Sequence, residues 1–298
     1  MFCQPVLTTG WIRNVGVLSV LWLVFSSPNI TARVTIHPVD TRNAALTGLH
    51  EALEQGLKQH QFHRAGRQGP LVTIGTAAFR DAIAQDASQP IIAAFITSTQ
   101  FEQSLSVRRR PTHITAVFSN PDPLAQYALA QILLGHPAVG VFETRATLQL
   151  TARLTQHAGR AVRAIPVSPG QDTNALIRTL SPLDALIVLP DVTVINRTNI
   201  NHVVRSLYQQ RKVLIGYSET LTRIGGLASI FPRRDAIIAS VIETVTAYYR
   251  SGDMPAPGFV RDLDIAVNKR LARSLNIAIP ETRALLQEIR ERGAAVNP

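Results

Sequence analysis

Short apolar runs alternate along this chain with stretches in which apolar residues recur every three or four positions. The runs have the length of buried strands, and the stretches between them have the periodicity of amphipathic helices. Strands are predicted at 33–37, 71–74, 91–95, 114–118, 138–142, 162–165, 185–189, 213–216 and 225–231. Helices are predicted at 43–60, 76–85, 123–134, 146–158, 173–180, 199–210 and 234–250. Apolar strands that alternate with helices predict parallel sheets covered on both faces, and so an α/β fold.

Loops divide this pattern into two lobes. The loop at Arg108–Pro111 separates a first strand–helix series from a second. "SGDMPAPG" at 251–258 then breaks the chain, and the closing stretch 262–289 holds two short helices on either side of Pro280. No strand is predicted in the polar segment 59–69. We therefore expect two α/β lobes, each a parallel sheet flanked by helices.

The chain is basic, with a formal net charge of +10, but its pattern does not favour nucleic-acid binding. Apolar residues make up 46% and charged residues 17%, which is typical of a globular protein with an ample core. The cations are mostly arginines and are scattered, with the densest run at Arg108–Arg110. Nucleic-acid grooves need a concentrated basic face with interleaved aromatic residues, and aromatics are only 6% here. We interpret the cations as a solvated surface and expect no nucleic-acid partner.

The segment 1–32 has the order of a secretory signal peptide. Arg13 precedes an apolar run at 15–25, small and polar residues follow, and no acidic residue lies among them. The run is shorter than the roughly 20 residues that span a bilayer, and a buried core strand is the alternative. Cleavage after Ala32 and a periplasmic location are predicted. Because Cys3 is the sole cysteine, no disulfide can form within the chain, and a lipid anchor on a later cysteine is not supported.

Longer stretches of the chain share their order of strands, turns and helices with a known family. They are "LVTIGTAAFRDAIAQDASQPIIAAFIT", "LDALIVLPDVTVINRTNI" through "VLIGYSETLTRIGGLASIF", and "DIAVNKRLARSLNIAIPETRALL". In this order they resemble the periplasmic substrate-binding proteins of ABC transporters, in the family with tryptophan- and tyrosine-binding members. The closing stretch, with an Asn, a basic helix, a Leu-x-Ile-x-Ile-Pro run and a last helix, is the most specific part.

This resemblance implies a type I periplasmic-binding-protein-like fold. The first lobe would comprise 33–112 with 232–298, and the second lobe 113–231, with crossings near 112 and 232. It also implies a protein without catalytic residues or a cofactor, whose lobes close around a small ligand in the cleft. The turn "FETRAT" at 142–147 departs from the family's usual Asn-Pro turn, so the ligand class is not carried across.

Binding residues in such folds lie at the carboxyl ends of parallel strands. Those positions here are Gly75–Thr76, Thr97–Ser98, Ser119–Asn120, Glu143–Thr144, Asp191 and Ser218–Glu219. From them we take as candidate ligand-binding residues Gly75, Thr76, Thr97, Ser119, Asn120, Asp191, Ser218 and Glu219.

Each of these side chains also has a structural interpretation. Thr76 either offers its hydroxyl to a carboxylate or caps the following helix. Asp191 and Glu219 either pair with an ammonium group or are solvated or capping acids. Arg145 either meets an acidic ligand or lies on the surface.

Signals for catalysis and metal binding are weak. "GYSET" at 216–220 approaches a nucleophile elbow around Ser218, but Thr220 stands where the second glycine belongs. His60 and His63 have helical spacing without a third ligand nearby. No phosphate-binding loop or dinucleotide fingerprint occurs. We expect neither a catalytic site nor a metal.

These patterns and the resemblance together predict a secreted solute-binding protein that captures a small ligand for an ABC-type membrane permease, with an amino-acid-like ligand as one candidate. The alternative is a ligand-sensing or partner-docking module of the same fold, which serves a membrane receptor or sensor kinase. A hydrolase built on Ser218 is a third, less favoured hypothesis.

Overall fold

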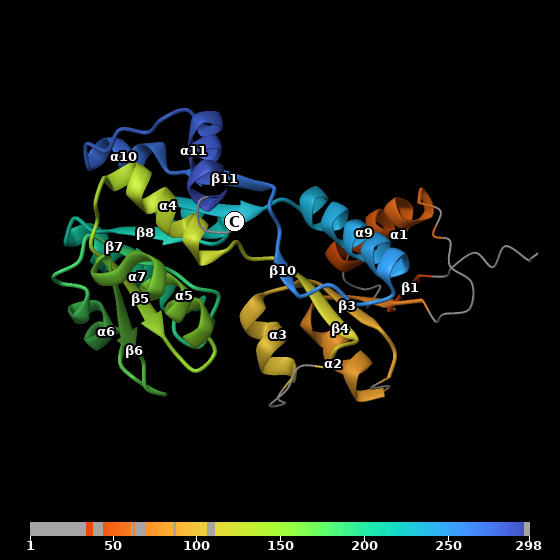
Figure 1. Ribbon diagram of the computed structural model, residues 1–298. Coiled ribbons are helices and arrows are strands. Elements are labelled where there is room, and N and C mark those ends of the chain that lie inside the picture. The colour runs from red at the N-terminus through yellow and green to blue at the C-terminus, as the bar shows by residue number, and fades with distance from the viewer. Residues whose placement is uncertain are drawn as a thin grey trace, which may run out of the picture.

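The computed structural model describes residues 34–37, 44–60, 62, 69–85, 88–105 and 111–294. They form two lobes, each built on its own sheet of mostly parallel strands with helices on both faces (Figure 1). The predicted fold class is therefore confirmed. The predicted signal segment 1–32, Arg108–Arg110 and most of 59–69 lie outside the described residues. None of the described helices is both long and apolar enough to cross a membrane.

The first lobe holds a parallel sheet in the order β1-β2-β3-β4-β10. Its strands are β1 (Thr35–Ile36), β2 (Leu71–Ile74), β3 (Ile91–Ile96), β4 (Ile114–Phe118) and β10 (Gly258–Phe259). Its helices are α1 (Ala44–Lys58), α2 (Gly75–Gln85), α3 (Ser98–Leu105) and α9 (Arg234–Ser251). Leu53 of α1 and Val241 of α9 pack in the core on one face. Phe79 of α2 and Phe101 of α3 pack in the core on the other, which explains why the central strands are apolar throughout.

The second lobe holds a sheet in the order β11-β9-β8-β7-β5-β6, in which only β11 is antiparallel. Its strands are β5 (Val139–Glu143), β6 (Val162–Pro166), β7 (Ala185–Ile187), β8 (Val213–Gly216), β9 (Ala228–Pro232) and β11 (Leu263–Val267). Its helices are α4 (Pro123–Leu134), α5 (Leu148–Ala158), η1 (Gly159–Ala161), α6 (Thr173–Thr179), α7 (Ile200–Gln209), α8 (Glu219–Ile224), α10 (Lys269–Ser274) and α11 (Thr282–Ala294). α4, α5, α10 and α11 contribute to the core on one face, and α6, α7 and α8 to the core on the other.

The strand pairing corrects the expected division into 33–112 with 232–298 and 113–231. β4 pairs in parallel with β3, so 114–118 belongs to the first lobe. At the other end, β11 pairs with β9 along its whole length. Leu285 and Ile289 of α11 are buried in the same core as α4. The closing segment therefore completes the second lobe, because that is where its apolar side chains find a core.

The described part of the chain passes between the lobes three times, after β4, β9 and β10. The first crossing, 119–122, leads from β4 to α4. The second leads from β9 to α9 at Arg233, and the third leads from β10 to β11 at 260–262. Figure 1 shows these segments side by side at the junction of the lobes. Such a set of short connections is typical of hinged two-lobed proteins.

Candidate functional site

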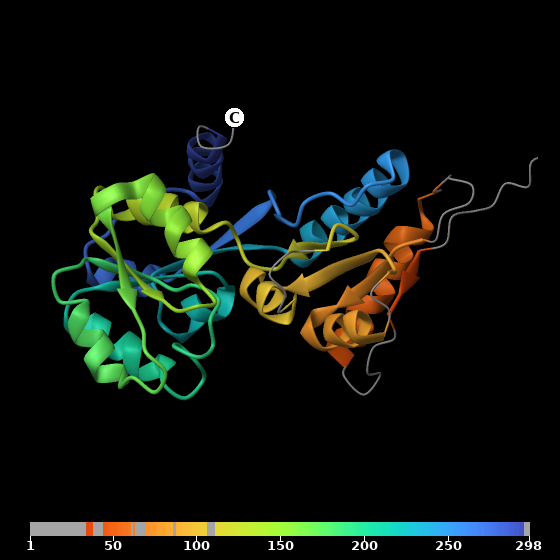
Figure 2. The same cartoon turned by 60° about the horizontal axis from the view of Figure 1, so that its bottom comes forward.

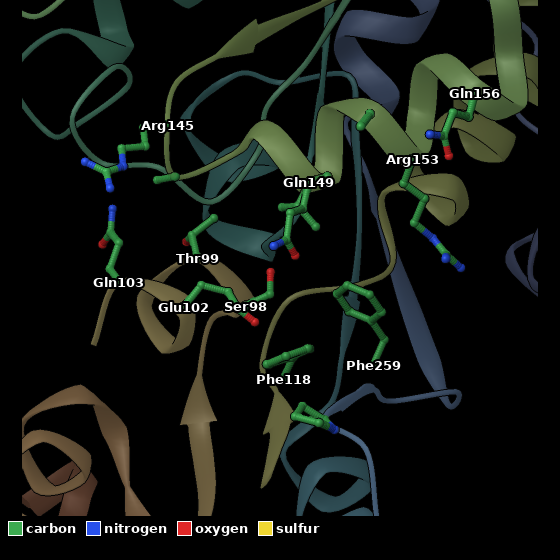
Figure 3. Close-up of a pocket in the computed structure, with 14 residues that line it drawn as sticks. Ser98, Thr99, Glu102, Gln103, Phe118, Arg145, Gln149, Arg153, Gln156 and Phe259 are labelled. Atoms are coloured by element: carbon green, nitrogen blue, oxygen red, sulfur yellow. The ribbon is translucent and has the colours of Figure 1, made fainter. Parts of the chain in front are cut away.

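A cavity of about 1010 Å³ lies between the two lobes, at the upper end of the range for small-molecule sites. Both lobes contribute to its walls, and Figure 3 shows the side chains that line it. The first lobe supplies α3, the end of β4 and β10, and the second supplies α5 with the turn before it. Figure 2 gives a second view, in which α3 again lies at the boundary with the second lobe.

The N-terminus of α3 forms one wall. Thr97 and Gln100 make a capping box, in which Thr97 N donates to Gln100 Oε1 (3.1 Å) and Gln100 N donates to Thr97 Oγ1 (3.2 Å). Ser98 N donates to Oδ1 of Asn120 at 2.8 Å, and Asn120 is buried. The hydroxyl of Ser98 lines the cavity, is buried, and has no hydrogen-bond partner among the described residues. Buried polar groups are normally paired, so this hydroxyl has hydrogen-bonding capacity to offer to a molecule in the cavity.

A hydrogen bond joins the lobes beside this wall. Thr99 Oγ1 donates to the carbonyl oxygen of Pro190, which follows β7, at 2.5 Å. Both Thr99 and Pro190 are buried. The contact fixes the start of α3 against the strand ends of the second lobe.

The opposite wall is the polar face of α5 and the turn before it. Gln149, Arg153 and Gln156 lie at i, i+4 and i+7 on this helix and all line the cavity. Arg145 lies in the preceding turn, and Figure 3 shows its guanidinium pointing toward Gln103 of α3. This wall presents arginine guanidinium groups and glutamine amides to the cavity.

Aromatic rings close another side of the cavity. Phe118 at the end of β4 and Phe259 of β10 both line it, with ring centroids 5.2 Å apart and planes inclined by 58°. Phe101 of α3 packs edge-on to Phe118 at 5.7 Å. These rings provide an apolar surface beside the polar walls, as pockets for small organic molecules commonly do.

The charges around the cavity balance. Arg145 and Arg153 are cationic and Glu102 of α3 is anionic. Arg153 also forms a forked ion pair with Asp122 of the first crossing, through Nε to Oδ1 (3.1 Å) and Nη2 to Oδ2 (2.6 Å). With Asp122 counted, two cations face two anions. Charges of both signs therefore lie in or beside the cavity walls.

Asp191 belongs to a separate network in the second lobe. Its Oδ2 accepts from Thr144 Oγ1 (2.6 Å), and its Oδ1 accepts from Thr193 N (2.8 Å) and Oγ1 (2.7 Å). Burial, and to a smaller extent the charge of Asp191, raise the pKa of Tyr217. The void that Asp191 lines is about 10 Å³, roughly the space of one water. Asp191 thus organises the loop after β7, and its pairing with a ligand ammonium stays a prediction.

Other predicted residues lie at strand ends but not in the cavity wall. Gly75 and Thr76 begin α2, and Gly75 has φ +80°, a left-handed conformation that suits glycine. Ser119 starts the first crossing, and its N–H donates to the end of β3. Ser218 and Glu219 lie at the start of α8. The cavity lining includes none of these five, and their contact with a ligand stays a prediction.

The α5 face is absent from the candidates predicted from the sequence. Strand-end reasoning finds Ser98 and the neighbourhood of Arg145, but it cannot find side chains in the middle of a helix. The available signal was the spacing of Gln149, Arg153 and Gln156, which places three long polar side chains on one helical face.

The residues behind the weak catalytic and metal-binding signals of the sequence are located in part by the structure. The hydroxyl of Ser218 makes no hydrogen bond to any described residue. His60 Nδ1 lies 2.9 Å from Gly56 O, and His63 lies outside the described residues. Within 34–294, the described residues include no group of three or more potential metal ligands.

Comparison with known proteins identifies the fold. No family model matches the chain, and no curated protein matches it by sequence. A Streptococcus pneumonia ABC domain in complex with L-Trp is 18% identical, with a TM-score of 0.57 over 87% of this chain and 98% of that one. A ligand-free, open substrate-binding protein with adhesive properties from Clostridium difficile is 15% identical, with a TM-score of 0.62 over 85% and 97%. A conserved domain protein from Vibrio cholerae is 18% identical, with a TM-score of 0.55 over 87% and 98%. The chain therefore has the two-lobed fold of ABC-transporter substrate-binding proteins, as the sequence resemblance implied.

Proposed function

We propose that this protein is a non-enzymatic solute-binding protein that captures a small zwitterionic ligand, of the amino-acid kind, between its lobes. It would deliver this ligand to an ABC-type permease in the membrane. The observation that carries the proposal is the cavity itself, whose walls come from different lobes and present donors, an acid and aromatic rings. The similar structures include an ABC domain in complex with L-Trp and a ligand-free substrate-binding protein, and this supports the same role.

The geometry of α3 suggests how a zwitterion would be held. Ser98 and Glu102 both line the cavity and are one turn apart on this helix, so their side chains are neighbours. The Ser98 hydroxyl and the positive end of the helix dipole favour a carboxylate. The Glu102 carboxylate favours an ammonium group. An apolar side chain would lie against Phe118 and Phe259.

Ligand binding would work by shifting the balance between open and closed forms. A ligand that contacts α3 and α5 together stabilises the closed form, because only that form makes both sets of contacts. The backbone crossings allow this motion, and the Thr99–Pro190 hydrogen bond keeps the start of α3 in register with the second lobe.

Thermal unfolding of the chain without residues 1–32, against a panel of amino acids and small carboxylates, tests the proposal. A ligand at 100 times its dissociation constant stabilises the fold by about 2.7 kcal/mol, which raises the melting temperature by several degrees. Small-angle scattering should then show a smaller radius of gyration with that ligand. A flat panel from folded protein would refute the ligand-binding role.

The membrane partner needs a separate experiment. Capture of the protein's partners from cross-linked membranes should yield permease components. Recovery of a receptor or sensor kinase alone would replace delivery with sensing. N-terminal sequencing of exported protein checks the predicted cleavage after Ala32 and the periplasmic location.

A further inference from the structure

Arg153 lines the cavity, but it is already engaged by an acid from the protein itself. Its Nε and Nη2 donate to the two carboxylate oxygens of Asp122 at 3.1 and 2.6 Å. This forked geometry is the one in which an arginine binds the carboxylate of a ligand. The side chains are 37% and 21% exposed, so the pair is partly shielded from solvent. The third guanidinium nitrogen, Nη1, donates to no described residue.

Asp122 is held in place independently of Arg153. It lies in the first crossing between Pro121 and Pro123, whose rings restrict the backbone. Its Oδ1 also accepts from Leu124 N at 3.0 Å and so caps α4. A carboxylate fixed by a helix cap and two prolines does not readily swing away when a ligand enters. Asp122 therefore acts as a standing counter-ion to Arg153.

We infer that Asp122 is a specificity-determining residue, which occupies the place of a ligand carboxylate on Arg153 and so makes the cleft select zwitterions against ligands with an additional acidic group. This inference rests on the proposed ligand-binding role. Arg145 and Glu102 also line the cavity and carry charges of opposite sign. An additional carboxylate finds Arg153 already neutralised and lies near the charge of Asp122.

The test compares L-glutamine with L-glutamate, which have nearly the same shape and differ by one negative charge, together with succinate as a dianion. Asp122→Asn removes the charge but keeps the helix cap, because Asn caps about as well as Asp. In this variant the preference for L-glutamate over L-glutamine, measured by calorimetry or thermal shift, should rise by about tenfold, the scale of one charge-assisted hydrogen bond. Succinate should gain affinity similarly.

Arg153→Gln provides the second arm. In the Asp122→Asn/Arg153→Gln double variant the gain for glutamate and succinate should disappear, because the site of the added carboxylate is gone. Glu288→Gln is the matched control, since it removes the same charge from an exposed pair with Arg292 on α11. It should leave the preference unchanged.

The outcomes separate this inference from the proposed function. If the unaltered chain binds a panel member but Asp122→Asn does not change the glutamate preference, the inference is overturned and the binding role stands. A change of equal size in Glu288→Gln would assign the effect to net charge and also overturn it. If neither glutamate nor succinate binds the Asp122→Asn variant at millimolar concentration, the inference fails, because an uncompensated Arg153 in the wall must attract these anions. A flat response of the unaltered chain to the whole amino-acid panel counts against the proposed function instead.

Discussion

Replacing Ser98 with alanine removes a buried hydroxyl that lines the cavity without a partner among the described residues. An unpaired buried polar group costs about 1–3 kcal/mol, and alanine in a helix is favoured over serine by a few tenths of a kcal/mol. A small loss of packing offsets part of this gain. We expect the empty Ser98→Ala protein to be more stable by roughly 1 kcal/mol, which raises its melting temperature by about 2–4 °C.

The same substitution should weaken ligand binding. A hydrogen bond to a charged group contributes about 1.5–3 kcal/mol, so the dissociation constant should rise by roughly tenfold to a hundredfold. Stability without ligand and affinity for ligand therefore change in opposite directions. Denaturant unfolding measures the first, and titration calorimetry with the best panel ligand measures the second.

Ser104 supplies the control, because it is a buried serine on the same helix whose hydroxyl is paired. Its Oγ donates to Gln100 O (2.7 Å) and accepts from Arg80 Nε (3.1 Å). Ser104→Ala should destabilise the empty protein by about 1 kcal/mol and leave ligand affinity unchanged. If Ser98→Ala instead loses stability as Ser104→Ala does and binds ligand normally, the Ser98 hydroxyl has a structural role and the reasoning is refuted.

Other substitutions test the supports of the site and of the fold. Asn120→Ala leaves the N–H of Ser98 without its acceptor, so it should cost about 1–3 kcal/mol of stability and weaken ligand binding, as unfolding and calorimetry would show. Gly216→Ala adds a methyl group 2.4 Å from Ser229 Oγ, and this overpacking should cost about 1–3 kcal/mol in denaturant unfolding. Burial raises the pKa of Tyr249 to about 12 from 10.0; its neutral form is favoured on folding, so its contribution is complete below pH 10 and is lost as the pH rises toward 12. Between pH 10 and 12, the free energy of unfolding of Tyr249→Phe should therefore fall less than that of the unaltered chain. Equal falls in denaturant unfolding would contradict the raised pKa of Tyr249.

Much of the fold could be predicted from the sequence because buried parallel strands leave a strong signal. The apolar runs at 91–96 and 185–187, for example, are central strands of the two sheets. The sequence indicates less clearly to which lobe a segment belongs. The closing segment 263–294 has the apolar residues of a packing element, but its sequence does not specify which sheet it covers. That choice depends on the pairing of β11 with β9, which is a long-range contact.

The site was predicted in outline but not in detail, for a physical reason. Polar residues at strand ends serve several purposes, and their local sequence is similar in each case. Thr97 caps α3, whereas the next residue, Ser98, lines the cavity. Which of these two neighbours faces the cavity depends on the direction in which the helix starts. The polar face of α5 shows helical spacing, but it becomes a wall only when the other lobe lies opposite.

The first crossing, 119–122, supports one residue on each polar wall of the cavity. Asn120 holds the backbone of Ser98 on one wall, and Asp122 holds the guanidinium of Arg153 on the other. Both supports belong to the four-residue segment on which the lobes hinge. A rotation of this segment would therefore move a donor on each wall at the same time. Substitutions in the crossing should change both affinity and the open–closed balance of the empty protein, whereas Ser98→Ala should change affinity and leave that balance unaltered.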